Sequence, residues 1–232
     1  MARKLGKKYK KLVDKVDSSK VYTLEEAIKL VKDLSYTSFT SSIDMHANIK
    51  LQKGQDPRSI KGAITLPNVI KQKDVKIAVC VPVDMKEKAQ KAGADFYDFT
   101  EITKQIESGN IQFDTLLAVP QMMPELAKYG KELGPKGLMP NPKTGTVVNP
   151  NNLESVISEY KKGKTVIKVD KTGVLHVAVG NVKMEDEKIA ENIRAIISFM
   201  QSLLGKSKEA IFKKVYLAPT MGPSVQVNIR SI

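Results

Sequence analysis

The stretch GPKGLMPNPKTG (residues 134–145) carries the residue types of a loop that holds phosphate groups. When the P-loop pattern GxxxxGK[ST] is laid over it, Gly137 takes the first position and Lys143 and Thr144 take the last two. Pro142 stands in place of the second glycine, and a proline lacks the backbone N–H with which such a loop cradles phosphate. We therefore expect a rigid, extended loop here and no bound nucleotide.

Few other residues could support catalysis or metal binding. The single cysteine, Cys80, lies in the apolar run IAVCVPV (77–83), which predicts a buried free thiol. His46 and His176 lie in separate segments without the HExxH spacing of a zinc site. The chain also lacks a GxGxxG motif and a convincing nucleophile–base pair. We expect no metal, no cofactor and no enzymatic activity, and an enzyme stays an alternative only because α/β sheets often carry active sites.

The strongest signal in the composition is the formal net charge of +13. An excess this large favours a nucleic-acid partner, with an anionic membrane surface as the alternative. No stretch resembles a basic amphipathic membrane helix, the longest apolar run is too short to span a bilayer, and the first residues lack the apolar core of a secretory signal. We therefore expect a cytosolic protein that does not bind membranes.

The middle of the chain alternates between short strands and helices. KIAVCVPV (76–83) and TLLAVP (115–120) are apolar runs typical of strands covered on both faces. Asp84 has a glutamate, Glu87, three residues on, which is the spacing of a capping box and predicts the start of a helix. Further helices are predicted in QMMPELAKYGKELG, ended by Gly134, and in LESVISEYKK. This alternation predicts a parallel sheet with crossover helices.

The flanking segments have a different pattern. Thr23 and Glu26 form a capping box ahead of the amphipathic stretch LEEAIKLVKDL. Residues 43–51 alternate strictly between apolar and polar, which predicts a strand with one buried face. TVIKVDKTGVLHVAV (165–179) predicts two strands joined by a turn at DKTG. A long amphipathic helix, MEDEKIAENIRAIISFMQSLLG, and two strands joined by the loop PTMGP (219–223) complete the chain.

These patterns predict an α/β protein of two domains. Residues 1–68 alone offer too few elements for a core, but with 160–232 they give a fuller sheet and two helices. We therefore expect a discontinuous α+β domain, 1–68 plus 160–232, with an α/β domain, 69–159, inserted into it. The inserted segment holds 11 Lys against 12 Asp or Glu, a net of −1, so the flanks carry +14. A polyanion should therefore bind the flanks.

Several motifs resemble the ribosomal protein L-one family of the large subunit. MMPELAKYGKELGPKGLMPN (122–141) resembles the family signature, and the likeness continues through PKTGTV (142–147). KTGVLHVAVG (171–180) and TMGPSVQVN (220–228) follow in family order. The opening GKKYKKLVDKVDSSKVYTLEEAIKLVK (6–32) is similar to the start of bacterial members. The resemblance therefore runs from end to end.

The resemblance implies a fold and a function. Family members have a domain built from both termini and an inserted Rossmann-like, three-layer domain that binds no dinucleotide. They bind large-subunit rRNA in the mobile stalk beside the tRNA exit site, where they aid the release of tRNA. Many bacterial members also bind their own mRNA and repress its translation. The expected protein is a monomer when free and cytoplasmic in the large subunit, with a free-standing translational repressor as the alternative.

The resemblance implies RNA contacts in three segments and at one further lysine. These positions are Phe39, Ser42, Asp44, His46, Lys171, Thr172, Gly173, His176, Lys214, Thr220, Met221, Gly222 and Ser224. They would form one patch if strand 43–51, the DKTG turn and the final hairpin lie side by side.

The chemistry of these residue types suits RNA. Phe39 could stack on a base or ribose, although an anchor in the core is an open alternative. Asp44 repels phosphate and would have to accept a hydrogen bond from a 2′-hydroxyl or base amino group, which favours selectivity. In DKTG the lysine supplies charge, the threonine a hydroxyl, and the glycine a close approach of the backbone. Met221 suits a ribose face. Plain hairpin turns stay open for DKTG and TMGPS, as does a partly buried position for His176.

The sequence departs from the family pattern at three places. Many relatives carry a basic residue before the aromatic one, whereas this chain reads SFTSS (38–42); Ser42 still offers a hydroxyl. Lys214 stands where some relatives have serine and could add a phosphate contact. The first crossing between the predicted domains, TLPNVIK (65–71), lacks the glycines of many relatives, which predicts a stiffer hinge.

Overall fold

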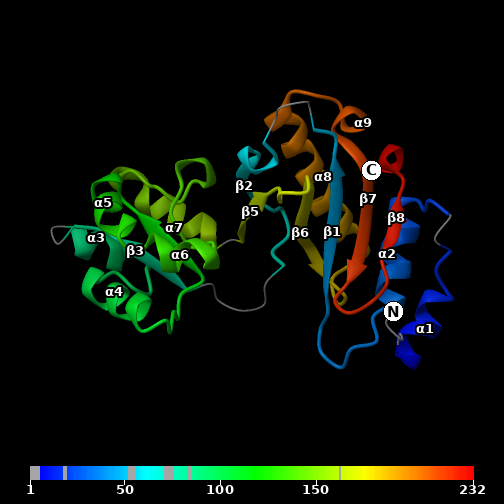
Figure 1. Cartoon of the computed structure of the whole chain (residues 1–232), viewed down its shortest axis with the longest axis horizontal. Helices are drawn as coiled ribbons and strands as arrows, with labels where there is room; N and C mark the ends of the chain where they lie inside the picture. The colour runs from blue at the N-terminus through cyan, green and yellow to red at the C-terminus, as the bar shows by residue number, and fades with distance from the viewer. Residues whose placement is uncertain (1–5, 18–19, 52–55, 71–75, 83–84, 162) are drawn as a thin grey trace. The chain divides into compact units, whose positions relative to one another are not determined.

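In the computed structural model the chain divides into two compact units, Met1–Ile70 with Ile167–Ile232 and Lys71–Val166 (Figure 1). The structure describes residues 6–17, 20–51, 56–70, 76–82, 85–161 and 163–232. Both units combine strands with helices, which confirms the α/β class.

The first unit is built on a four-stranded antiparallel sheet with the strand order β6-β1-β7-β8. The strands are β1 (Ser42–Ile49), β6 (Val174–Asn181), β7 (Phe212–Pro219) and β8 (Val225–Val227). The alternation predicted for residues 43–51 is confirmed along β1. Its apolar residues are buried, and the polar residues between them are partly exposed. The sheet therefore has one buried face and one polar face.

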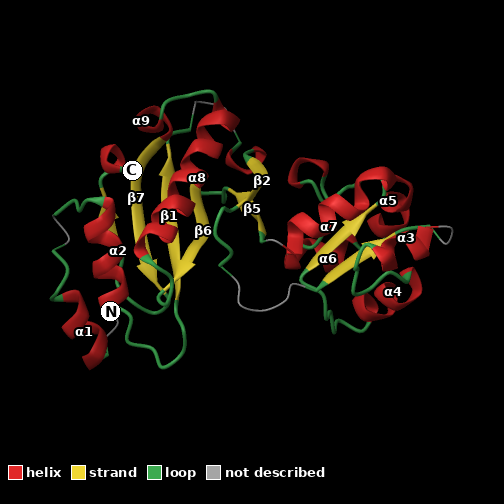
Figure 2. Cartoon of the chain, turned by 180° about the vertical axis from the view of Figure 1, so that it is seen from behind, coloured by secondary structure: helices red, strands yellow, loops and turns green. Residues whose placement is uncertain are grey.

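Two helices cover the buried face of this sheet. They are α2 (Leu24–Asp33) and α8 (Asp186–Leu204), and Figure 2, drawn from behind, shows α8 in front of the strands and α2 beside β7. Their apolar side chains join those of the strands in one core. The predicted capping box is confirmed, because Glu26 N donates to Thr23 Oγ1 (3.4 Å) and Thr23 N donates to Glu26 Oε2 (3.2 Å). The polar face of the sheet lies toward the viewer in Figure 1.

Two short helices of this unit were not predicted. They are α1 (Lys7–Val13) and α9 (Lys208–Ile211), which leads directly into β7. The segment KKYKKLV looks like a solvated basic run, yet Leu12 is buried and packs into the core. The burial of Leu12 in the core stabilises α1, and the charge pattern of the sequence does not show this contact.

The two strands predicted on either side of DKTG form, and the turn joins them. β5 (Lys164–Lys168) pairs with β2 (Lys61–Thr65) in a separate two-stranded sheet, while β6 pairs with β1. Beside the turn, an isolated antiparallel bridge joins Val169 to Leu175. The predicted strands and the turn at DKTG are therefore confirmed, whereas the main partner of each strand is another strand that local spacing does not encode.

The second unit has a parallel sheet with helices on both faces. β3 (Ile77–Cys80) and β4 (Thr115–Ala118) pair in parallel, and parallel bridges at Phe96 and Val147 extend the sheet on either side. One face packs against α3 (Lys86–Lys91) and α7 (Leu153–Lys161), and the other against α4 (Phe99–Glu107), α5 (Met123–Ala127) and α6 (Gly130–Lys136). Asp84, predicted to start a helix, lies outside the described residues. Cys80 is buried as predicted, and burial raises its thiol pKa to about 12.

The predicted helix ending at Gly134 is corrected by the structure. It is split into α5 and α6, and α6 runs on to Lys136 with Pro135 inside its last turn. Gly137, at φ 72°, takes the left-handed position that ends the helix. Pro135 has no backbone N–H and therefore donates no helical hydrogen bond, and the helix ends at the residue after it.

The loop that follows α6 binds its own backbone. Lys143 N donates to Asn141 Oδ1, and Gly145 N donates to Pro142 O. Thr144 N and Thr146 N both donate to Asn141 O. Asn141 N in turn donates to Thr146 Oγ1 at 2.7 Å. Because each of these N–H donors is already used within the loop, none of them is free to bind phosphate. This agrees with the proline that stands at the position of the second P-loop glycine.

Candidate nucleic-acid interface

The polar face of the first unit's sheet presents side chains in rows across the strands. In the central row His176, His46, Tyr216 and Gln226 stand opposite one another on β6, β1, β7 and β8. Asp44 lies between Ala178 and Ala218 in the next row, and Asn48 lies between Val174 and Lys214. We call this surface the open face. It combines hydrogen-bonding groups with an aromatic ring and small side chains that leave room for a ligand.

Hydrogen bonds join two loops at the end of the open face where β1 begins. Thr220 N donates to Ser42 O (3.0 Å), and Ser42 N donates to Thr220 Oγ1 (3.2 Å). Ser41 Oγ donates to Thr220 O (3.4 Å) and lies 2.9 Å from Thr37 Oγ1. These bonds hold residues 37–42 against residues 219–222. We call this group of residues the loop cluster.

The loop cluster exposes two large apolar side chains. Phe39 is 56% exposed and Met221 is 66% exposed, the two highest values among large apolar side chains of the described residues. The alternative that Phe39 anchors the core is therefore wrong. Met221 is also the one described non-glycine residue with a positive φ, 68°. A left-handed conformation costs a residue with a side chain about 1–2 kcal/mol, so this tip is strained as well as exposed.

Neighbouring residues of the loop cluster have structural tasks. A Cβ on Gly222 would lie 2.5 Å from Pro219 Cγ and 3.2 Å from Leu34 O, so the turn admits no side chain there. The hydroxyl of Thr220 is bonded to the backbone of Ser42, which leaves it less free than expected for a ligand. Ser224 is exposed beyond the turn.

The DKTG turn is organised by its aspartate. Asp170 Oδ1 accepts hydrogen bonds from Thr172 N, Thr172 Oγ1 and Val174 N, at 2.7–2.9 Å. These donors, the Val174 N–H first, hold the pKa of Asp170 below its ordinary value. Lys171 is exposed at the tip. Gly173 is buried at φ 82°, and a Cβ there would lie 2.9 Å from Leu51 Cδ1, so the turn needs glycine for its own packing.

The predicted segments lie along one sheet but at its two ends. Ser42 pairs with Asn181 and lies beside Thr220, whereas Asn48, at the other end of β1, pairs with Val174, which follows DKTG. The strand rises about 3.4 Å per residue, so the two ends of β1 lie about 24 Å apart. The strands lie side by side, as the predicted patch requires, and its residues gather in two clusters joined by the open face. Antiparallel order causes this, because the loop after β7 and the loop before β6 must emerge at opposite ends.

A histidine pair lies between the two clusters. His46 Nδ1 and His176 Nδ1 are 2.8 Å apart, so one ring donates and the other accepts. His176 Nε2 lies 3.7 Å from Asp170 Oδ2. Burial lowers the pKa of His46, the neighbouring His176 lowers it further, and Asp44 opposes both effects. The side chain of His176 is 53% exposed, so the partly buried alternative does not hold for it.

Sequence reasoning missed Tyr216 and Gln226 on the open face, and it did not include Asn48 among the contacts although the alternation puts Asn48 on the polar face of its strand. Each is half-buried and points to the same side as His46. The alternation in β7 and β8 could have shown that Tyr216 and Gln226 lie on the polar faces of their strands. No sequence signal shows that these faces adjoin that of β1, because the strands are far apart in the chain.

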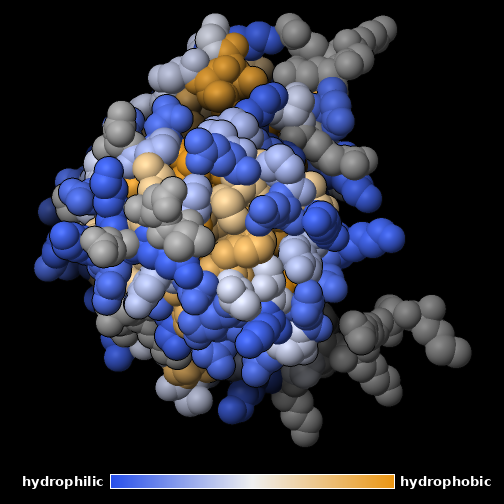
Figure 3. All heavy atoms as spheres, turned by 90° about the vertical axis from the view of Figure 1, so that its left-hand side faces the viewer, coloured by the Kyte–Doolittle hydropathy of each residue, from blue (hydrophilic) through white to orange (hydrophobic). Residues whose placement is uncertain are grey.

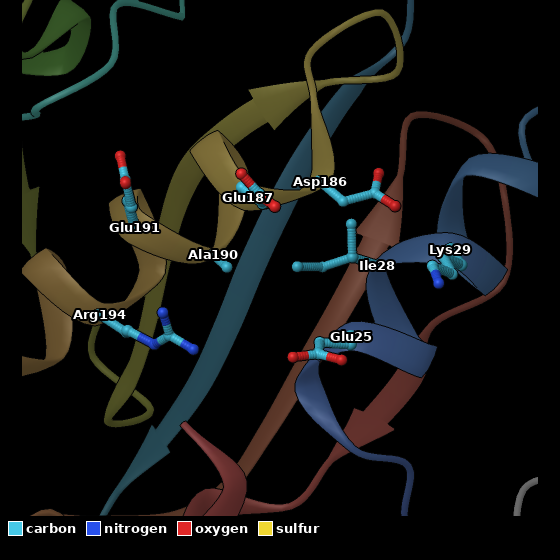
Figure 4. A pocket seen from close by; sticks show the side chains of 8 residues that line it. All are labelled: Glu25, Ile28, Lys29, Asp186, Glu187, Ala190, Glu191 and Arg194. Carbon is cyan, nitrogen blue, oxygen red and sulfur yellow. The ribbon is translucent and has the colours of Figure 1, made fainter.

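The helical face of the first unit carries a groove of a different character. It has a volume of about 510 Å³ and lies between α2 and α8 (Figure 4). Its lining residues are Glu25, Ile28, Lys29, Asp186, Glu187, Ala190, Glu191 and Arg194. Figure 4 shows Ile28 and Ala190 facing each other with charged groups around them. Four carboxylates against two cations disfavour a polyanion here, so this groove is not part of the candidate interface.

The described residues offer neither a cluster of metal ligands nor a helix that could span a membrane. They contain no group of three or more His, Cys, Asp or Glu side chains that could hold a metal ion. None of the helices found there is long and apolar enough to cross a membrane. Figure 3 shows one face of the molecule, on which hydrophilic residues predominate and apolar ones are scattered between them.

The sequence matches known proteins over almost its whole length. The model of the family described as "Ribosomal protein L1p/L10e family" matches residues 31–223. The chain is 38% identical over 228 residues to "Large ribosomal subunit protein uL1c" of Phaeodactylum tricornutum, covering 98% of both proteins. It is 37% identical over 230 residues to "Large ribosomal subunit protein uL1" of Thermus thermophilus, covering 98% of this chain and 99% of the relative.

These matches define a ribosomal protein rather than an enzyme. The chain belongs to the ribosomal protein L1p/L10e family, and the resemblance read from its motifs is confirmed.

Proposed function

We propose that the protein is a structural constituent of the large ribosomal subunit in the cytoplasm, and that it binds the rRNA of the mobile stalk. Membership of the family and the names of its relatives support the ribosomal role. The RNA contact is carried by one observation, the loop cluster, in which Phe39 and Met221 are exposed on loops fixed by hydrogen bonds. An aromatic ring and a thioether held in this way offer a rigid surface for base or ribose faces.

The remaining predicted residues act around this contact. Ser42 and Ser224 offer hydroxyls beside the loop cluster, while Thr220, Gly222 and Gly173 keep the two turns in shape. Asp44, His46 and His176 face the RNA from the open face as hydrogen-bonding groups. Lys171, Thr172 and Lys214 contact it at the far end of β1, with the lysines directed to phosphate.

The domain built from both termini, 1–68 plus 160–232, is the RNA-binding part, and the Rossmann-like segment 69–159 is inserted into it. Charge supports this division, since the flanks carry the whole positive excess. At the first crossing, Asn192 accepts from Asn68 N (3.0 Å) and donates to Asn68 O (3.0 Å), which fits the predicted stiffness. Lys71, the last residue of that crossing, lies outside the described residues.

In the subunit the protein acts beside the tRNA exit site and aids the release of tRNA, and it is a monomer when free. The same surface represses translation of its own mRNA where that message carries a similar RNA fold. The family resemblance supports both roles. A free-standing repressor differs from a ribosomal protein in one measurable respect, its absence from ribosomes.

The ribosomal role is tested by sedimentation of ribosomes from the native organism at moderate salt. We expect the protein to travel with the large subunit. Recovery of all of it in the soluble fraction would overturn the assignment and favour repression alone.

The interface is tested by the affinity of Phe39→Ala for a stalk RNA fragment. Loss of a stacked base costs about 1–3 kcal/mol, which is roughly 5- to 150-fold in affinity. Leu203→Ala is the matched control, because Leu203 is another exposed apolar side chain, 42% exposed, and lies on α8. Equal affinities of the two variants would contradict the proposed contact.

A further inference from the structure

A basic pocket lies at the end of the sheet farthest from the loop cluster. It has a volume of about 320 Å³ and is lined by the residues where β1 ends and β7 begins, and by the turn η6 (Ile229–Ser231). Its charged lining residues are Lys50, Lys213, Lys214, Arg230 and Glu209. Four cations against one carboxylate give this pocket a net positive charge, whereas the groove between α2 and α8 has a net negative charge.

A β-bulge brings two consecutive lysines to this surface. In the pairing of β1 with β7, Asn48 stands opposite Lys214 and Ile49 opposite Phe212, which leaves Lys213 as an extra residue. A regular strand would turn one of two adjacent side chains inward, whereas here both Lys213 and Lys214 are exposed and Phe212 is buried. Neither lysine side chain has a hydrogen-bond or ion-pair partner among the described residues. Both charges are thus available to a ligand.

Glu209 holds the other two cations in place. Its backbone oxygen accepts from Lys50 Nζ at 2.8 Å, and its carboxylate accepts from Arg230 Nε at 3.1 Å. The side chain of Asn228 accepts from Arg230 N (3.0 Å) and so fixes the turn that carries this arginine. The single carboxylate of the pocket is therefore paired with Arg230, so it holds a cation in place and leaves no unpaired negative charge.

The pocket is continuous with the open face. Gln226, which lines the pocket, stands opposite Tyr216 in the row that includes His46. Lys214 belongs both to the pocket and to the row of Asn48. A ligand lying along the open face from the loop cluster would reach the four cations after about 24 Å.

We propose that this pocket binds phosphate groups of the RNA backbone, at nucleotides other than those at the loop cluster. The proposal rests on the RNA binding proposed above and deepens it by assigning Lys50, Lys213 and Arg230, beside Lys214, to a second contact. Two lysines unpaired among the described residues, beside two cations held by Glu209, suit phosphate, which binds lysine and arginine without regard to sequence. The loop cluster supplies selectivity, and this pocket supplies salt-dependent affinity.

The test compares Lys213→Gln/Lys214→Gln with Lys29→Gln/Arg194→Gln in the full-length protein. Both double variants lose two positive charges from the first unit, but the second pair lies in the acidic groove between α2 and α8. Affinity is measured from 50 to 200 mM salt for a stalk RNA fragment and for an unrelated RNA duplex. Loss of two phosphate contacts lowers the salt slope by about 1.4–1.8, so the ratio of wild-type to variant affinity should shrink roughly 7- to 12-fold over this range.

We expect the Lys213/Lys214 variant to show this change on both RNAs and the control variant to keep the wild-type slope. A wild-type slope in the Lys213/Lys214 variant, with stalk RNA still bound, would overturn the phosphate site alone. Equal losses in both double variants would also overturn it, because a general charge effect would then explain them. Failure of the wild-type protein to bind stalk RNA would instead refute the proposed function.

Discussion

Replacement of Met221 by glycine should separate folding from RNA binding. The left-handed backbone at Met221 costs about 1–2 kcal/mol with a side chain, and glycine removes that cost. Two losses oppose this gain. The greater chain entropy of glycine costs about 0.5–1 kcal/mol. Loss of the buried third of the side chain costs about another 0.5–1 kcal/mol. The terms nearly cancel, so we expect the free energy of unfolding to change by less than about 1 kcal/mol.

The same substitution should weaken RNA binding strongly. The exposed two-thirds of the Met221 side chain is available for burial against RNA, worth about 1–2 kcal/mol. A contact between sulfur and a base ring adds about 0.3–1.5 kcal/mol. Together these give a loss of roughly 10- to 400-fold in affinity for the stalk RNA fragment.

The assay pairs urea unfolding with RNA titration for Met221→Gly and for the control Leu203→Ala. Wild-type affinity in Met221→Gly would show that the strained tip is only a turn. A fall in stability of more than about 2 kcal/mol would show instead that the side chain serves the fold, because the opposing terms would no longer cancel.

Three further predictions concern the framework of the interface. Thr23→Ala removes the capping box of α2 and should lower the free energy of unfolding by about 1 kcal/mol in urea titration, whereas Thr23→Ser should not. Gly173→Ala should cost about 1–3 kcal/mol, because it adds a left-handed side chain close to Leu51; a neutral result would refute the need for glycine. The pKa of His46 is lowered on folding from 6.5, so its stabilising contribution is complete above that pH and is lost as the pH falls through the folded pKa. His46→Gln should flatten this fall in urea midpoints measured between about pH 5 and 7, and an unchanged profile would exclude His46 as its cause.

The sequence predicted those parts of the fold that depend on local chemistry. The capping box at Thr23 and the alternation along β1 follow from side-chain types at fixed spacings, and both are confirmed. The partner of β5 could not be predicted, because a strand pattern does not say which strand lies beside it. The same limit hid the row that joins Tyr216 and Gln226 to His46, since three separate segments contribute to it.

The candidate site was predicted from the family resemblance, with residue types that suit RNA, and not from conformation. The chemistry of Met221 and Phe39 favoured contact with RNA, and the sequence left a core position for Phe39 open as an alternative. The exposure of both, and the positive φ of Met221, depend on the conformation of their loops, which residue types alone do not specify. The bulge at Lys213 could not be predicted from the sequence for a related reason. Two adjacent lysines break a strand pattern in the sequence, and only the register against β1 shows that the strand continues through them.

The two ends of the open face differ in the kind of energy that they can contribute. Residues 35–42 and 219–224 contain no charged side chain, so contacts there should depend weakly on salt and strongly on the bases and riboses that they meet. The basic pocket at the other end has the opposite character, because its contribution comes from counterions released by phosphate contacts. An RNA that fits only the loop cluster would therefore be bound selectively but less tightly than one long enough to reach Lys213 and Lys214. It follows that shortening the stalk RNA at the pocket end should reduce the salt slope of the wild-type protein at least as much as Lys213→Gln/Lys214→Gln does, while the effect of Met221→Gly stays the same.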